Sequence, residues 1–205
     1  MKTRSKALLL TLCAIALVVA TVFGTMAYLT STASVENTFT VGSVNITLDE
    51  AKVNTDGTPV EGADRVTSNT YKLMPGHTYT KDPTVHVVAG SEDSYIFVKV
   101  ENGISAFEAA ASTEEGGYKT IAEQITANDW AALDGVPGVY YKTYTGTAAA
   151  DLVVFDNFKI ADNANTVGGW GNVSAETTKV TVTAYAVQKD GFNTAAAAWD
   201  ATFGA

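Results

Sequence analysis

The sequence predicts an all-β protein, an antiparallel β-sandwich with short helical insertions, preceded by an N-terminal signal helix. Three observations predict this class. Apolar and polar residues alternate with a period of two in about seven to nine short segments. Clusters of Gly, Pro, Asn and Asp separate these segments, as turns separate antiparallel strands. Strands do not alternate regularly with helical segments, which argues against a parallel α/β sheet.

The first 27 residues have the layout of an export signal. Three basic residues precede an uncharged apolar run at 7–24, and small residues stand at Thr25 and Ala27. A signal peptidase would cut after Ala27, so that Tyr28 begins the mature chain. The run is nearly long enough to span a bilayer, and retention as an N-terminal anchor is the alternative. The expected divisions are a signal peptide at 1–27, a mature N-terminal segment at 28–36 and a β-sandwich domain at 37–205.

Charge and cysteine usage restrict the partners of the mature chain. All 22 acidic residues follow the signal but only 10 of the 13 basic ones do, which leaves a net charge of −12. Such a surface disfavours nucleic acid and anionic lipid, so the membrane is contacted only through the signal before cleavage. The single cysteine, Cys13, lies in the signal, so no disulfide can hold the domain together. We therefore expect a protein secreted by a Gram-positive bacterium, in its extracellular matrix or on its surface.

The segment at 38–48 predicts two short strands. Its apolar positions change phase after Gly42, and a glycine at such a shift indicates a β-bulge or a sharp bend. Residues 51–70 are rich in turn-forming residues and predict a loop, with a hairpin turn at 55–57.

The next strands are expected at 83–88 and 95–101. The dipeptide Pro75–Gly76 predicts a turn before the first strand, and residues 90–93 predict a turn between the two. The second strand alternates two sets of side chains, and the apolar triplet should face the core. That triplet is Ile96, Val98 and Val100.

The middle of the chain has a helical pattern rather than a strand pattern. One or two short helices are expected in a long connection at about 102–135, because Ile121 and Ile125 stand at helical spacing among Ala, Glu and Gln residues. Residues 128–130 predict a turn that leads into a strand.

Strands return in the last third of the chain. They are expected at 139–144, 152–160 and 179–188, and the last has the strongest alternation. Asn193 is expected to cap a closing alanine-rich helix that runs through Trp199.

The chain carries little catalytic chemistry. The mature part has two histidines, His77 and His86, expected to face solvent or lie at a rim, and the zinc pattern His-Glu-x-x-His is absent. The acidic pairs Asp49–Glu50 and Glu114–Glu115 should be solvated, since neighbouring side chains on a strand point to opposite faces. The loop at 54–57 has oxygens suited to calcium but lacks the later bidentate glutamate. The sequence predicts no enzyme, no catalytic or metal-binding residue and no cofactor, and an extracellular hydrolase ranks last.

Aromatic residues motivate a second class of function. Trp130, Trp170 and Trp199, together with nine tyrosines, could line a sugar-binding face. Aromatic residues of strands more often fill or cover the core. Trp170 lies in the glycine-rich stretch 168–171, which is expected to be a flexible loop.

Three short blocks of the sequence resemble a known protein family. The first combines residues 24–29 with 37–44, the second combines 73–81 with 95–100, and the third is the late strand at 180–187. Together they resemble the TasA/CalY (camelysin) family of exported matrix-fibre proteins from Gram-positive bacteria. The resemblance implies a jelly-roll-like β-sandwich, fibre assembly with itself or with related subunits, and cleavage by the specialised signal peptidase SipW.

The resemblance also implies an interface. In fibres of that family, the mature N-terminal segment of one subunit adds as a strand to the next. Here the corresponding residues are Tyr28, Leu29, Thr30, Ser31, Thr32, Ala33, Ser34 and Val35. They contain no Pro or Gly and favour an extended chain, and a frayed terminus is the alternative. The protease activity associated with camelysin is not transferred, because no matching catalytic constellation is present.

The sequence therefore favours a secreted structural protein that forms or joins extracellular or biofilm matrix fibres by donor-strand exchange. The alternative is a monomeric cell-surface adhesin or glycan-binding module.

Overall fold

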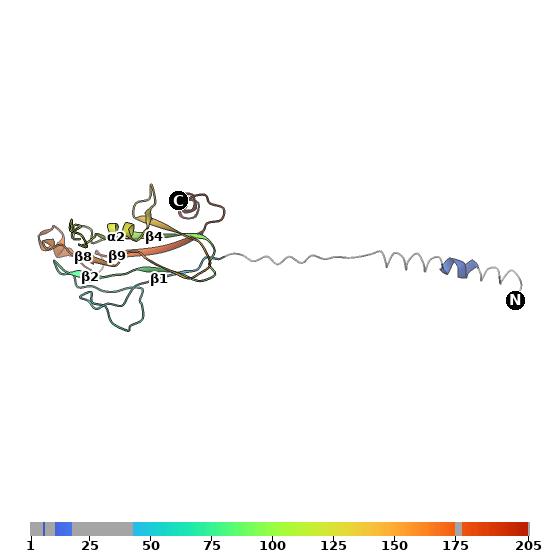
Figure 1. Cartoon of the computed structure of the whole chain (residues 1–205), viewed down its shortest axis with the longest axis horizontal. Coiled ribbons are helices and arrows are strands. Elements are labelled where there is room, and N and C mark those ends of the chain that lie inside the picture. The colour runs from blue at the N-terminus through green and yellow to red at the C-terminus, as the bar shows by residue number, and fades with distance from the viewer. Residues whose placement is uncertain (1–5, 7–10, 18–42, 175–177, 205) are drawn as a thin grey trace. The chain divides into compact units, whose positions relative to one another are not determined.

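The computed structural model describes residue 6 and residues 11–17, 43–174 and 178–204 (Figure 1). The chain divides into two units, Met1–Val41 and Gly42–Ala205. In the first unit the described residues are helical and exposed. Among all described residues, no helix combines the length and apolar character needed to cross a bilayer. The predicted strand at 38–41, the cleavage position and the segment at 28–36 lie outside the described residues.

The second unit is mostly β, as predicted. Its described part contains nine strands, two α-helices and two short 3-10 helices, η1 and η2, and all strand pairings are antiparallel. In chain order the elements are β1 (Ile46–Asp49), β2 (Thr78–Thr80), β3 (Thr84–Val87), β4 (Ser94–Asn102), α2 (Ile121–Ala127), β5 (Ala131–Ala132), β6 (Val139–Tyr144), β7 (Ala150–Val153), β8 (Asn157–Lys159), η1 (Ala164–Thr166), η2 (Trp170–Asn172), β9 (Val180–Gln188) and α3 (Ala195–Phe203).

The strands form three sheets. The order is β1-β3-β7 in one sheet and β5-β6-β4-β9 in a second, while β2 and β8 form a two-stranded ribbon. In Figure 1, β4 and β9 run together along one layer and β1 runs along the layer opposite them. This order leaves β1 and β9 each at the edge of its sheet, and the two edge strands lie close to one another.

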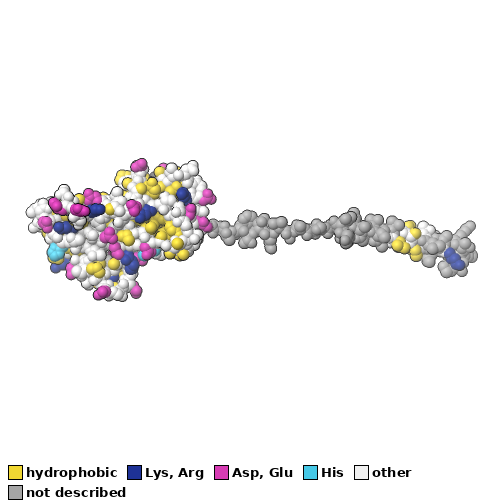
Figure 2. All heavy atoms as spheres, in the orientation of Figure 1, with side chains coloured by type: hydrophobic (Ala, Val, Ile, Leu, Met, Phe, Trp, Pro, Cys, Tyr) yellow, Lys and Arg dark blue, Asp and Glu magenta, His cyan; other side chains and the backbone are white. Residues whose placement is uncertain are grey.

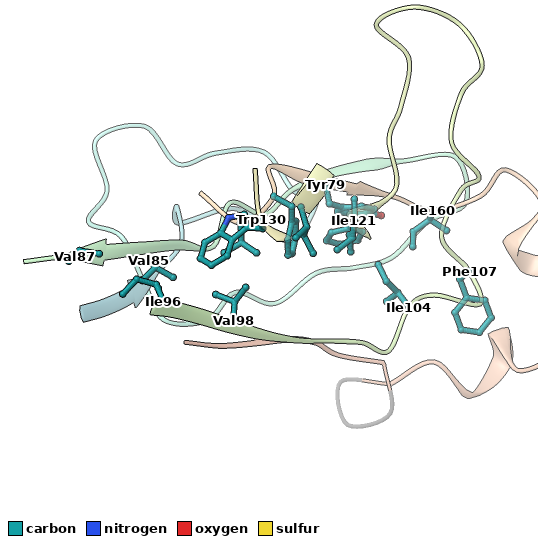
Figure 3. Packing of buried hydrophobic residues seen from close by; sticks show 14 of the residues in the cluster. Tyr79, Val85, Val87, Ile96, Val98, Ile104, Phe107, Ile121, Trp130 and Ile160 are labelled. Carbon is teal, nitrogen blue, oxygen red and sulfur yellow. The ribbon is translucent and has the colours of Figure 1, made fainter. Parts of the chain in front are cut away.

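The main core lies between these layers. Val85 from β3 and Ile96 and Val98 from β4 are completely buried, and Trp130 is 1% exposed. Figure 3 shows these side chains pointing into the space between the strands. The predicted inward set of β4 is thereby confirmed for Ile96 and Val98, while Val100 is half-buried at its edge.

The opposite face of β4 is buried as well. Phe97 is fully buried, and the ring of Trp199 from α3 lies 5.2 Å from it. The helix α3 therefore covers this face with a second, smaller cluster. Its N-cap is Thr194, whose hydroxyl accepts a hydrogen bond from the Ala197 N–H at 3.1 Å, so the prediction of Asn193 as the cap was wrong by one residue.

The long connection contains one helix, α2, within the predicted range. Thr120 and Glu123 form a capping box at its start, and Ile121 and Ile125 point into the core. The Gln124 amide donates to the Asn157 carbonyl at 2.9 Å and accepts from the Asp156 N–H at 3.0 Å. These bonds attach α2 to the segment that precedes β8.

The predicted single strand at 152–160 is two strands in different sheets. Val154 and Phe155 between them are fully buried, and the Val154 N–H donates to the Pro83 carbonyl at 2.8 Å. The chain thus leaves the sheet of β7 at Val154 and pairs again as β8 with β2. Continuous apolar character hid this change of sheet, because residues on both sides of it are buried.

Candidate functional site

A cavity of about 860 Å³ opens between the edge strands β1 and β9. Leu48, Asp49 and Glu50 line it from the β1 side, and Val180, Thr181 and Val182 line it from β9. Other lining residues come from the loop before β2, from β8 and from the η2 region. They include Asn69, Tyr71, Leu73, Lys81, Ile104, Phe158, Trp170 and Val173.

Backbone groups of both edge strands are directed toward this cavity. Just beyond the paired ends of β4 and β9, the Gly103 N–H donates to the Lys179 carbonyl at 2.8 Å. The odd-numbered residues of β9 therefore form the hydrogen bonds with β4. Because hydrogen bonding alternates along an antiparallel pair, Val180 and Val182 direct their N–H and C=O groups away from β4. The same alternation applies to β1, where the Val88 N–H donates to the Asn45 carbonyl at 2.9 Å. Leu48 therefore directs its backbone groups away from β3.

The floor of the cavity is apolar and aromatic. Phe158 is 2% exposed, and its ring lies 5.2 Å from that of Tyr71 in an edge-on arrangement. Trp170 is half-buried and packs edge-on against Phe107 at 5.4 Å. An apolar floor between two strand edges is a surface that an extended segment can occupy, with backbone pairing along the edges and alternate side chains in the floor.

Burial changes the chemistry of Tyr71. Burial, followed by the charges of Glu50 and Asp82, raises the pKa of its phenol well above the ordinary value. The phenol donates a hydrogen bond to the Thr80 carbonyl at 3.0 Å. Tyr71 is therefore a neutral, hydrogen-bonded part of the cavity wall.

The acidic pair Asp49–Glu50 is not solvated surface, which corrects the prediction. Glu50 is 4% exposed and bonds the Lys81 ammonium at 2.5 Å, while Asp49 bonds Arg65 and His86. The two carboxylates do have different partners on different sides of the strand, as the period of two requires. A sequence signal was available: an acidic residue at a strand end, followed by a loop with basic residues, is a position where a buried pair can form.

His86 is half-buried, which agrees with a rim position, but its two charged partners were not predicted. Its side chain is 26% exposed and lies between two carboxylates, with Nδ1 2.6 Å from Asp151 and Nε2 2.9 Å from Asp49. The hydrogen bonds to Asp151 and then to Asp49 raise its pKa above the ordinary value. Burial raises the pKa of Asp49, but the bonds from Arg65 and His86 outweigh it, so the pKa of Asp49 lies below the ordinary value. The cluster joins β1, β3 and β7.

The remaining predicted residues fall into three groups. His77 and the pair Glu114–Glu115 are exposed, as predicted. Trp130 and Trp199 are buried in the two cores, so of the three tryptophans only Trp170 lines the cavity. Within residues 43–174 and 178–204, no cluster of three or more His, Cys, Asp or Glu residues is arranged to hold a metal ion. The cleavage pair Ala27 and Tyr28 and the predicted interface at 28–35 lie outside the described residues.

Sequence reasoning missed the cavity itself. Its walls come from β1, the loop before β2, β8 and β9, which are distant in the chain. The available signal was the alternation in the strand predicted at 179–188, which indicates two different faces but not an open strand edge.

Comparison of the chain with protein-family models, with curated proteins and with solved structures found no significant match.

Proposed function

We propose that this chain is a secreted structural protein that forms or joins extracellular matrix fibres by donor-strand exchange. A SipW-type signal peptidase would cut between Ala27 and Tyr28, and residues 28–35 of one copy would enter the cavity between β1 and β9 of the next. The proposal includes a jelly-roll-like arrangement of the strands. It also includes a relationship to the TasA/CalY family, which the sequence resembles.

The single observation that carries the proposal is the pair of strand edges that border one cavity with apolar and aromatic residues among its lining. Val180 and Val182 direct backbone donors and acceptors toward it, and so does Leu48. Exposed strand edges are ready templates for another chain, and most proteins protect them. Here a segment with no Pro or Gly, Tyr28 to Val35, is available in the same chain.

The acidity of the chain suits a partner that binds through backbone pairing. Acidic and basic side chains are interspersed on the visible face of the second unit in Figure 2, with small apolar groups between them. The segment at 28–35 carries no charged residue, so it avoids the repulsion that two copies with a net charge of −12 each would experience.

The first experiment compares the chain that begins at Tyr28 with a chain that lacks residues 28–35. Negative-stain electron microscopy should show filaments of the first and only folded monomers of the second. Filaments of unchanged length from the shortened chain would refute the proposal. A folded monomer from both chains would also refute it.

The second experiment tests the cavity directly. A synthetic peptide of residues 28–36, added to the shortened chain, should shift the fluorescence of Trp170 and saturate at one peptide per chain. Val182→Lys places a charge in the cavity and should abolish the shift, whereas Val60→Lys, at an exposed loop position, should preserve it. A scrambled peptide that binds equally well would contradict the assignment.

The alternative function is a monomeric cell-surface adhesin or glycan-binding module. It is favoured by one observation, the position of Trp170 and Tyr71 in a cavity with a polar rim of threonines and serines. It predicts saturable glycan binding that Trp170→Ala weakens at least tenfold. A glycan array without signal at high protein concentration would exclude it.

A further inference from the structure

Three side chains on the wall of the cavity form a constellation that donor-strand exchange does not require. Glu50 is the residue after β1, Lys81 is the residue after β2, and Asn69 lies in the loop between these two strands. The Lys81 ammonium lies 2.5 Å from Oε2 of Glu50, and the Asn69 amide nitrogen lies 3.1 Å from Oε1 of the same carboxylate. One carboxylate therefore bridges an amine and a carboxamide.

The constellation is held in place, and the side chains of two of its members are largely shielded from water, while Asn69 is half-buried. The side chains of Lys81 and Glu50 are 11% and 5% exposed. The Glu50 backbone exchanges two hydrogen bonds of 2.8 Å with Val66. The Asn69 amide donates to the Ala51 carbonyl at 2.8 Å and its oxygen accepts the Val53 N–H at 3.0 Å, which fixes the orientation of the amide.

We propose that Lys81 and Asn69 form an intramolecular amide cross-link, with Glu50 as the proton-transfer group. A buried lysine amine beside a base is a competent nucleophile, and a carboxamide carbon is a suitable electrophile. Both reactants contact the same carboxylate, so proximity replaces the need for an external catalyst or co-reactant. This inference is independent of fibre formation.

The atoms and protons balance. Glu50 accepts a proton from Lys81 at Oε2, and the amine nitrogen then attacks Cγ of Asn69. The negative charge that develops on Oδ1 faces the Val53 N–H. The Cγ–Nδ2 bond breaks, and Nδ2, which lies beside the same carboxyl group, takes the proton that Glu50 accepted and leaves as ammonia. The second proton lost by the lysine nitrogen stays on Glu50 until ammonia removes it as ammonium.

The experiment measures the intact mass of the purified chain and of its tryptic peptides. The cross-linked chain should be lighter than its sequence requires by one ammonia, about 17 Da. Trypsin should release residues 66–72 joined through Asn69 to a peptide that is uncut at Lys81. A full-mass chain with separate peptides would overturn the proposal.

Variants separate this reaction from others with the same mass change. Lys81→Arg and Asn69→Ala should both restore the full mass, and Glu50→Gln should slow formation of the cross-link by about 100-fold or more. Lys52→Arg and Asn54→Ala, at exposed positions nearby, should keep the loss of ammonia. If Lys81→Arg shows the same loss, the product is a succinimide at Asn69 and the proposal fails.

Discussion

Asp49 and Glu50 are neighbours in the chain, but their carboxylates act in different places because successive side chains on a strand point to opposite faces. Glu50 bonds Lys81 on the cavity side and is buried. Asp49 instead bonds Arg65 and His86. A step of one residue along the chain therefore separates the ion pair of Glu50 and Lys81 from a charge cluster that joins three strands.

The histidine of this cluster should make stability depend on pH. The folded pKa of His86 is raised, so its contribution is fully present below the ordinary histidine pKa of about 6.5 and is lost as pH rises through the folded pKa. Asp151 is 74% exposed at its side chain, which limits the effect to roughly 1 kcal/mol or less.

The measurement is the free energy of unfolding of the wild type and of His86→Gln between about pH 6 and pH 9. The wild type should lose stability as pH rises, and the variant should lose less. His77→Gln, at an exposed position without these carboxylates, should behave as the wild type. A parallel pH profile for His86→Gln and the wild type would contradict the assignment.

At the scale of elements, β9 has two functionally different sets of backbone groups. Odd-numbered residues such as Thr181 bond β4, and even-numbered residues such as Val182 face the open edge. Proline lacks a backbone N–H, so it is tolerated at edge-facing positions and disrupts the ladder elsewhere. Single substitutions at two adjacent positions can therefore separate effects on the stability of β9 from effects on its pairing with a second chain.

Val182→Pro should leave the free energy of unfolding within about 1 kcal/mol of the wild type and should greatly reduce filament formation. Thr181→Pro should instead cost about 1–3 kcal/mol, because the Glu101 carbonyl opposite it loses its donor. Denaturant unfolding and negative-stain microscopy of both variants provide the measurements. Normal filaments from Val182→Pro would show that this edge does not accept the incoming strand.

At the scale of the whole molecule, charge opposes association. Every copy that begins at Tyr28 carries a net charge of −12, whereas the segment that would enter the neighbour is uncharged. Repulsion between copies is screened within about 10 Å at 0.1 M salt, so assembly should depend on ionic strength. Backbone pairing of an uncharged segment inside the cavity should depend on it far less.

Filament elongation should therefore accelerate by about tenfold between low salt and about 0.15 M NaCl, as followed by light scattering. The double variant Glu114→Lys and Glu115→Lys, in an exposed loop, reduces the repulsion and should show a weaker dependence on salt. An elongation rate that does not change with salt would indicate that charge repulsion does not limit the encounter.

The sequence by itself determined the mostly β character of the second unit, the position of α2 and the inward face of β4, because alternation and helical spacing are local and each segment carries its own pattern. Only the tertiary structure decided that residues 152–160 change sheet, that α3 buries the second face of β4 and that Glu50, Asn69 and Lys81 meet beside an open strand edge. These features depend on which strands become neighbours. That choice is made by packing between residues far apart in the chain, which a local pattern does not encode.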